Sequence, residues 1–229
     1  MIVLTNCLAL VGNHNFTCST NQVALEVKAA ELDATTFCSA GWETKVGGLC
    51  SATVKHSGFA DYGSTDAAFP ANVGVNGLPV SIVVDNTAGS TAYLLRGFEG
   101  SMSTLGKVGD LSPIDGNITS DGPAARGVLA LAPSVPSTGA LAVAQLGAIT
   151  SGRRAVAIMH LLGGTGTVSF ELQSAATVGF ASPTVRASVT AAATATWIES
   201  STVTADAFWR INVTAVTGSP TIALAMGTT

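Results

Sequence analysis

The chain has 229 residues, of which 47% are hydrophobic and only 10% are charged, and its formal net charge is −4. This length suffices for one large or two small domains with a buried core. Ten Lys and Arg residues against 14 Asp and Glu residues do not supply the basic face that a sequence-independent DNA-binding protein needs. The composition therefore disfavours that class of protein.

The alternating segments predict β-strands, and a single helix is expected. Val and aromatic residues alternate with polar ones, or form short β-branched runs, in the ranges 23–28, 80–84, 167–172 and 208–213. Breaks between such runs recur about every ten residues, which is typical of a β-sandwich or barrel. A helix is expected around residues 65–73, where Thr65 can cap its first turn. The predicted fold class is mainly β with one short helix.

Residues 133–139 are dense in Pro and Ser and predict an extended link. We therefore expect a β domain over residues 1–132 and a second β unit over residues 140–229. Gly47–Gly48 and Gly163–Gly164 each precede an alternating segment at an offset of about half the chain. This spacing leaves two alternatives open: a degenerate internal repeat, or an appended sandwich.

The scarcity of charge favours self-association. A monomer commonly keeps itself soluble with about 25–35% charged residues on its surface, and charge is depleted in the cores of protein interfaces. The alternative is a compact, sparsely charged extracellular β domain. No apolar run is long enough for a transmembrane helix, and no cation precedes Lys28, so we expect neither a membrane span nor a secretory signal.

The cysteines and histidines predict no metal or cofactor site. The cysteines, Cys7, Cys18, Cys38 and Cys50, lack the close spacing of zinc ligands. We expect buried thiols, and a disulfide is the alternative. His14 is close to Cys18 in sequence, but that alone is a weak signal. His56 and His160 are expected to be half-exposed strand residues, and no Gly-x-Ser-x-Gly elbow accompanies them, so no catalytic residues and no enzyme are predicted.

Two further patterns have an ordinary structural interpretation. Residues 115–122 place oxygen side chains at alternate positions, as calcium loops do, but Ser120 stands where an EF-hand has Gly and no Glu closes the loop. A polar hairpin loop is the favoured interpretation. Trp42, Trp197 and Trp209 are expected in core or interface packing. Arg153 and Arg154 form a cationic pair that could meet carboxylates of a neighbouring subunit or flank a solvated turn.

Several short motifs resemble the major tail tube proteins of long-tailed, siphovirus-like bacteriophages. The resemblance is carried by "ELDATTF" (31–37), "GWETKVGGL" (41–49), "ATVKHSGFAD" (52–61), "YLLRGF" (93–98), "GKVGD" (106–110), "RG" (126–127) and "FWR" (208–210). It covers most of residues 22–132 and the remainder more loosely.

The resemblance implies a β-sandwich or barrel whose long hairpins join those of neighbouring subunits around a lumen. It implies a structural virion protein, made in the host cytoplasm, that forms stacked rings of three or six chains and serves as a conduit for genome delivery. Its implied partners are other copies of the chain, tape measure and tail terminator proteins, and viral DNA that passes without specific binding. Asp110, Asp115 and Asp121 are the candidate lumen-facing acidic residues. The alternative function is a carbohydrate-binding or surface-decorating jelly-roll module with Trp197 and Trp209 on an exposed face.

Overall fold

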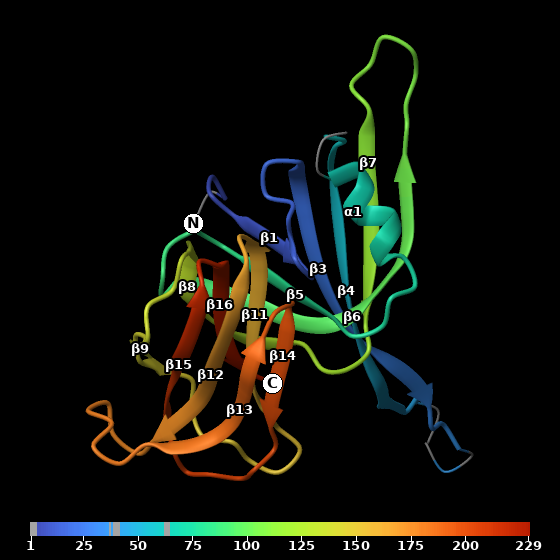
Figure 1. Cartoon of the computed structure of the whole chain (residues 1–229). Coiled ribbons are helices and arrows are strands. Elements are labelled where there is room, and N and C mark those ends of the chain that lie inside the picture. The colour runs from blue at the N-terminus through green and yellow to red at the C-terminus, as the bar shows by residue number, and fades with distance from the viewer. Residues whose placement is uncertain (1–3, 37, 39–41, 62–64) are drawn as a thin grey trace.

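The computed structural model describes residues 4–36, 38, 42–61 and 65–229, and nearly all of its regular structure is β-strand (Figure 1). The strands are β1 (Leu8–Val11), β2 (His14–Asn15), β3 (Thr20–Asp33), β4 (Lys45–Phe59), β5 (Leu78–Val83), β6 (Thr91–Thr104), β7 (Pro113–Ser120), β8 (Ala125–Ser134), β9 (Gly139–Ala140), β10 (Ala144–Gln145), β11 (Ala155–Gly163), β12 (Gly166–Ala175), β13 (Thr184–Ala192), β14 (Thr196–Ser200), β15 (Phe208–Gly218) and β16 (Thr221–Thr228). One helix, α1 (Thr65–Asn72), occurs among the described residues.

The predicted fold class is confirmed. The four alternating segments lie in β3, β5, β12 and β15, and the expected helix is α1. Pro70 lies inside this helix and lacks the N–H that a continuing α-helix would use, which accounts for its short length. The described helix is too short to cross a membrane.

Strand β6 is the branch point of an eleven-stranded sheet. The main path runs β14-β11-β16-β8-β6-β5-β1-β2. The first half of β6 pairs with β8 from Thr91↔Val128 to Leu94↔Ala125, and the second half pairs with β7 as far as Thr104↔Ile114. Strand β7 in turn pairs with β4, and β4 with β3. One long strand therefore belongs to two sheet regions that diverge from it.

A five-stranded sheet packs over one end of this system. Its order is β10-β15-β12-β13, with β9 also on β15. A buried cluster joins its strands β12 and β15 to strands β8, β11 and β16, and its largest members include Trp209 and Phe170. The two sheets therefore form a β-sandwich in the C-terminal part of the chain (Figure 1).

The opposite face of β11 and β16 is equally buried, against strands from the N-terminal part. This second cluster includes Leu8, Leu94, Leu129, Ile158 and Ala225. Successive residues of β11 point to opposite faces, so Ile158 and Met159 fill different clusters. A strand buried on both faces reads as a continuous apolar run, as β11 does.

A third cluster fills the space enclosed by β1, β5, β4, β7 and α1. Its members include Phe16, Val54, Ile82, Ile114 and Ile118. Each fully buried aliphatic or aromatic side chain of this kind contributes roughly 1.5–3 kcal/mol relative to exposure. This cluster anchors the bases of two long hairpins that extend beyond the body of the chain.

Three sequence expectations meet a different structure. Gly47 and Gly48 were expected to precede the alternating segment, but they lie inside the same strand, β4. Residues 115–120 belong to β7, so the predicted polar loop is wrong up to Ser120, and only residues 121–124 connect to β8. The expected link, residues 133–139, starts within β8 and ends in β9. The division into units 1–132 and 140–229, and their relation as repeats, stay predictions; β11, β14 and β16 extend the sheet of the first unit.

His160 ties the two parts of the chain together from within the core. It lies on β11, fully buried, and its Nδ1 donates to the carbonyl oxygen of Gly12 while its Nε2 accepts from the Ser81 hydroxyl, each at 2.8 Å. Burial lowers the pKa of His160 from 6.5 to about 4, although the hydrogen bond to Gly12 opposes this shift. The expectation of a half-exposed strand histidine is wrong here, since the imidazole is held neutral inside the protein.

We predict that this histidine makes the fold acid-sensitive. Between pH 6.5 and 4, His160 is protonated in the unfolded chain but stays neutral in the folded chain. The free energy of unfolding should therefore fall by about 3 kcal/mol as the pH drops through this window. Urea titrations from pH 7 to 4 measure this fall. His160→Gln should remove most of it, and His14→Gln, at a half-buried site, should retain most of it. An unchanged pH profile in His160→Gln would contradict the assignment.

Candidate assembly interface

Strands β3, β4, β7 and the second half of β6 form what we call the hairpin sheet (residues 20–33, 45–59, 113–120 and 97–104), in the order β3-β4-β7-β6. Within the described part of the chain, β3 pairs with β4 alone. Beyond the bridge between Val73 and Glu99, residues 101–104 of β6 pair with β7 alone. The hairpin sheet therefore has two unpaired edges, and they lie on opposite sides.

The two hairpins project from opposite ends of this sheet (Figure 1). The β3–β4 hairpin continues beyond the end of β7, because Thr53 pairs with Thr119 while β4 already begins at Lys45. We call its described residues between 27 and 51 the arm. The β6–β7 hairpin ends in a loop at the other end, residues 105–112, which we call the tip.

Both projections expose large apolar side chains. In the arm these are Val27, Leu32, Trp42, Val46 and Leu49, with exposed fractions from 50% to 89%; in the tip they are Leu105, Val108 and Leu111, at 71% or more. A two-stranded hairpin with both faces in water is marginally stable, and clustered exposed apolar side chains mark interaction sites. The arm and the tip therefore have the character of surfaces that another chain covers.

The face of the hairpin sheet that points into the body holds an acid–base pair. His56 Nε2 lies 3.6 Å from Glu99 Oε1, and the two side chains are only 4% and 0% exposed. The Phe16 ring stacks on His56 with centroids 6.1 Å apart. Gly116 leaves room for the pair, since a Cβ there would lie 2.1 Å from His56 Nε2. The prediction of a half-exposed His56 is thus wrong: the residue packs beneath the sheet.

The opposite face of the hairpin sheet is polar and mixed in charge. Side chains alternate between the faces of a strand, and the register aligns Lys55 with Asn117 and Ser57 with Asp115. On β3, Glu26 and Lys28 form an ion pair of 2.8 Å. This outward face therefore carries positive and negative groups in balance.

The three candidate acidic residues are spread along the hairpin sheet and its ends, not gathered at one point. Asp110 is exposed in the tip, Asp115 is exposed on β7, and Asp121 follows β7 at the end away from the tip. Asp121 is ion-paired with Arg96 at 3.0 Å. That these residues face a lumen stays a prediction.

No group of three or more His, Cys, Asp or Glu side chains that could hold a metal occurs in the described residues. Cys18, Cys38 and Cys50 are exposed free thiols, and Cys7 is a half-buried one. The expectation of buried thiols is therefore wrong for three of the four. Cysteine thiols are buried on average in proteins, which is why burial was expected. Cys38 and Cys50, however, lie on the exposed β3–β4 hairpin.

The close contact between Ser81 and His160 is not a catalytic arrangement. Ser81 and His160 are both 0% exposed, so no substrate reaches them, and the other imidazole nitrogen is bonded to a carbonyl oxygen and not to a carboxylate. Trp209 is 0% exposed and donates from Nε1 to the carbonyl oxygen of Gly147. The alternative of a sugar platform that uses Trp209 is therefore wrong. Trp197 is half-buried and donates to Glu199.

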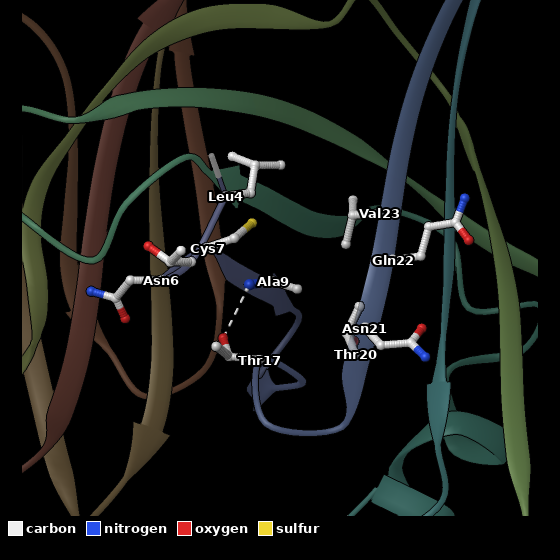
Figure 2. A pocket seen from close by; sticks show the side chains of 10 residues that line it. Leu4, Asn6, Cys7, Ala9, Thr17, Thr20, Asn21, Gln22 and Val23 are labelled. Carbon is white, nitrogen blue, oxygen red and sulfur yellow. Dashed lines mark hydrogen bonds between the residues drawn. The ribbon is translucent and has the colours of Figure 1, made fainter. Parts of the chain in front are cut away.

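A pocket of about 200 Å³ opens between β1 and the start of β3 (Figure 2). Its lining mixes Leu4, Asn6, Thr17 and Gln22 with the half-buried Cys7, and Thr17 Oγ1 accepts from the Ala9 amide at 3.1 Å. Burial raises the pKa of the Cys7 thiol, which disfavours the nucleophilic thiolate. This pocket marks where β1 and β3 approach without pairing, and it carries no catalytic set.

Sequence reasoning singled out Trp42 as a core or interface residue, but not the aliphatic residues of the arm and the tip. Leu105, Val108 and Leu111 lie among Gly106 and Gly109 in a segment that reads as a turn. Large aliphatic residues in a glycine-rich turn are a usable signal, because a solvated turn has no need of them. Glu99 was also missed, since its burial depends on His56 of a distant strand.

Neither a family model nor a curated protein matches the sequence. Among solved structures, a chain from the virion of a native gene transfer agent particle is 14% identical with a TM-score of 0.42, over 52% of this chain and 94% of that one. A chain from the tail of an empty gene transfer agent particle with C6 symmetry is 14% identical with a TM-score of 0.41, over 50% and 92%. SPP1 Dit (gp 19.1), described as a paradigm of the hub adsorption apparatus in phages infecting Gram-positive hosts, is 11% identical with a TM-score of 0.38, over 97% of this chain and 99% of that one. With TM-scores below 0.5, these similarities carry no functional argument.

We predict that Gly116→Ala destabilises the hairpin sheet. The new methyl group would displace the buried His56–Glu99 pair, and overpacking of this kind costs about 1–3 kcal/mol. Chemical denaturation of the parent, of Gly116→Ala and of a control variant measures the loss in the free energy of unfolding. Gly47→Ala is the matched control, because the Cβ at that strand position meets nothing within 4 Å. Equal stabilities for the two variants would contradict the tight packing at Gly116.

Proposed function

We propose that this chain is a structural virion protein of a long-tailed phage, whose copies join through the hairpin sheet into rings. The rings stack into the tail tube, a conduit for genome delivery. The observation that carries the proposal is the presence of two unpaired edges, β3 and residues 101–104 of β6, on opposite sides of one sheet.

The strand directions allow these edges to meet. The four strands of the hairpin sheet are antiparallel in the order β3-β4-β7-β6, so β3 and β6 run in opposite directions. When β3 of one copy lies beside β6 of the next, the new contact is an antiparallel pair like every other in the sheet. A contact between two different edges repeats head to tail, and it closes into a ring when the rotation permits.

Assembly also removes two liabilities of the isolated chain. Free edges and exposed apolar hairpins attract uncontrolled pairing unless they are covered. A ring pairs the edges, and neighbouring copies bury apolar side chains of the arm such as Leu32 and Leu49. The low content of charged residues, 10%, fits a surface that is largely covered by other copies.

Most of the motifs that resemble tail tube proteins lie on these same elements. Residues 31–36 and 42–61 belong to the β3–β4 hairpin and the segment that follows it, residues 93–98 to β6, and residues 106–110 to the tip. The motifs at residues 126–127 and 208–210 lie in β8 and β15, so the resemblance is concentrated in the hairpin sheet without being confined to it. Each chain contributes one hairpin sheet, which favours six copies in a ring over three.

The outward face of the hairpin sheet then lines the lumen. Lys55 and Asp115 on this face balance each other in charge, so the face lacks the cationic excess that binds DNA phosphates. DNA can pass along such a wall without being held. Tape measure and tail terminator proteins are the remaining partners that this role implies, with the virion tail as its location.

Substitutions in the arm can test assembly without disturbing the fold of the single chain. In Leu32→Glu/Val46→Lys two exposed residues that face each other across β3 and β4 are replaced by an opposite-charge pair, which supports the hairpin. We expect the parent protein to form rings as its concentration is raised. The double variant should need a protein concentration about ten-fold higher or more to form the same rings. Mass photometry across a concentration series measures the ring mass.

Val203→Lys is the matched control, since Val203 is an apolar residue at least as exposed as Leu32 and Val46, on a loop of the C-terminal sandwich. It should assemble like the parent. A parent chain that stays monomeric at every concentration would overturn the proposal, and so would a double variant that assembles as readily as Val203→Lys.

A further inference from the structure

The tip is built as a protruding apolar contact. Leu105, Val108 and Leu111 are 71%, 107% and 71% exposed. Leu105 has a φ of +73°, a left-handed conformation that is unfavourable for a non-glycine residue. A turn between Lys107 and Asp110 is closed by the Asp110 amide, which donates to the Lys107 carbonyl oxygen at 3.1 Å. Such a loop holds its side chains outward at a stability cost, as functional loops do.

A mainly apolar groove lies where the arm meets the body of the chain. Its lining includes Val27 and Cys50 from the arm, Pro123 and Ala124 from the connection between β7 and β8, and Arg153 from the turn before β11. The space within it is about 280 Å³. Arg153 is exposed, whereas its neighbour Arg154 is ion-paired with Glu199.

The tip and the groove lie at opposite ends of the hairpin sheet. Strand β7 begins at Pro113, directly after the tip, and ends at Ser120, directly before the groove residues Pro123 and Ala124. In Figure 1 the tip stands above the body of the chain, and the arm with the adjoining connection from β7 to β8 lies at the other end. A tip therefore cannot reach the groove of its own chain, but it can reach that of a copy stacked on it.

The charges of the two surfaces are complementary. Asp110 is exposed in the tip and Arg153 at the groove, and neither side chain has an ion-pair partner among the described residues. Opposite charges at two contacting surfaces fix their register and exclude wrong alignments. The apolar side chains of the tip would contribute buried area to the contact, and the Asp110–Arg153 pair would fix its alignment.

We infer that the tip of one copy docks into the groove of a second copy in the adjacent ring, with Asp110 beside Arg153, and that this contact stacks the rings. The inference rests on the proposed ring and adds its axial partner. The contact is head to tail, so every ring presents free tips on one face and free grooves on the other. It recurs once for each copy around a ring, so weak single contacts add up to firm stacking.

Charge reversal tests this pairing in the full-length chain. Asp110→Arg and Arg153→Asp each place like charges together, and each should raise the concentration needed for stacks by about ten-fold or more at low salt, because the repulsion repeats around the ring. The double variant Asp110→Arg/Arg153→Asp restores opposite charges and should stack within about three-fold of the parent. Negative-stain microscopy counts stacks, mass photometry measures single rings, and circular dichroism checks the fold.

The expected result is intact rings in all four proteins and stacks in the parent and the double variant only. Single variants that stack like the parent would overturn the inference, as would a double variant that is no better than either single one. Single variants that fail to form rings would also overturn it, since the tip would then belong to the contact within a ring. A parent that forms no rings removes the proposed function itself, which is a distinct result.

Discussion

The structure depends on the pairing of β-strand edges, and in the single chain that pairing is incomplete. Backbone N–H and C=O groups need partners, and in the part of the chain that the structure describes β3 pairs only along the edge that faces β4. The same holds for residues 101–104 of β6. A third buried cluster anchors the bases of both hairpins, yet their distal parts have solvent on both faces. The body of the chain is thus well packed, whereas the hairpin sheet leaves backbone edge groups unpaired among the described residues. The proposed ring would pair them.

The body of the chain is organised to hold that sheet rigidly. Strand β6 belongs both to the region with β8 and to the region with β7, so the hairpin sheet continues directly into the C-terminal sandwich. His160 links β11 to Gly12 and Ser81 inside the core. On the inner face the His56–Glu99 pair is sealed beneath β7. These contacts fix the direction in which the arm and the tip project, which the proposed ring requires.

Local sequence patterns predicted the strand segments and the helix, because half-buried strands alternate and turns use Gly, Asn and Pro. They did not predict which strands pair. The union of β8 with β16 and the burial of Glu99 beside His56 depend on residues far apart in the chain. Residues 115–120 were misread as a loop because Asp, Asn and Gly favour turns. In the structure these residues alternate along a strand: Asp115 faces solvent, and Gly116 makes room for two buried side chains. An Asp and a Gly at these positions are therefore compatible with a strand. The candidate site is a surface, and its apolar members looked like ordinary strand or turn residues.

Hydrogen–deuterium exchange of the assembled and the monomeric protein tests the central claim most directly. If ring formation pairs the free edges, amides in residues 20–33 and 101–104 should exchange at least about ten-fold more slowly in the assembly. Strand β13, an edge strand of the five-stranded sheet that pairs with β12 alone among the described strands, should exchange equally in both states. Assemblies in which β3 and the end of β6 exchange as fast as in the monomer would contradict the account, because the copies would then be joined through another surface.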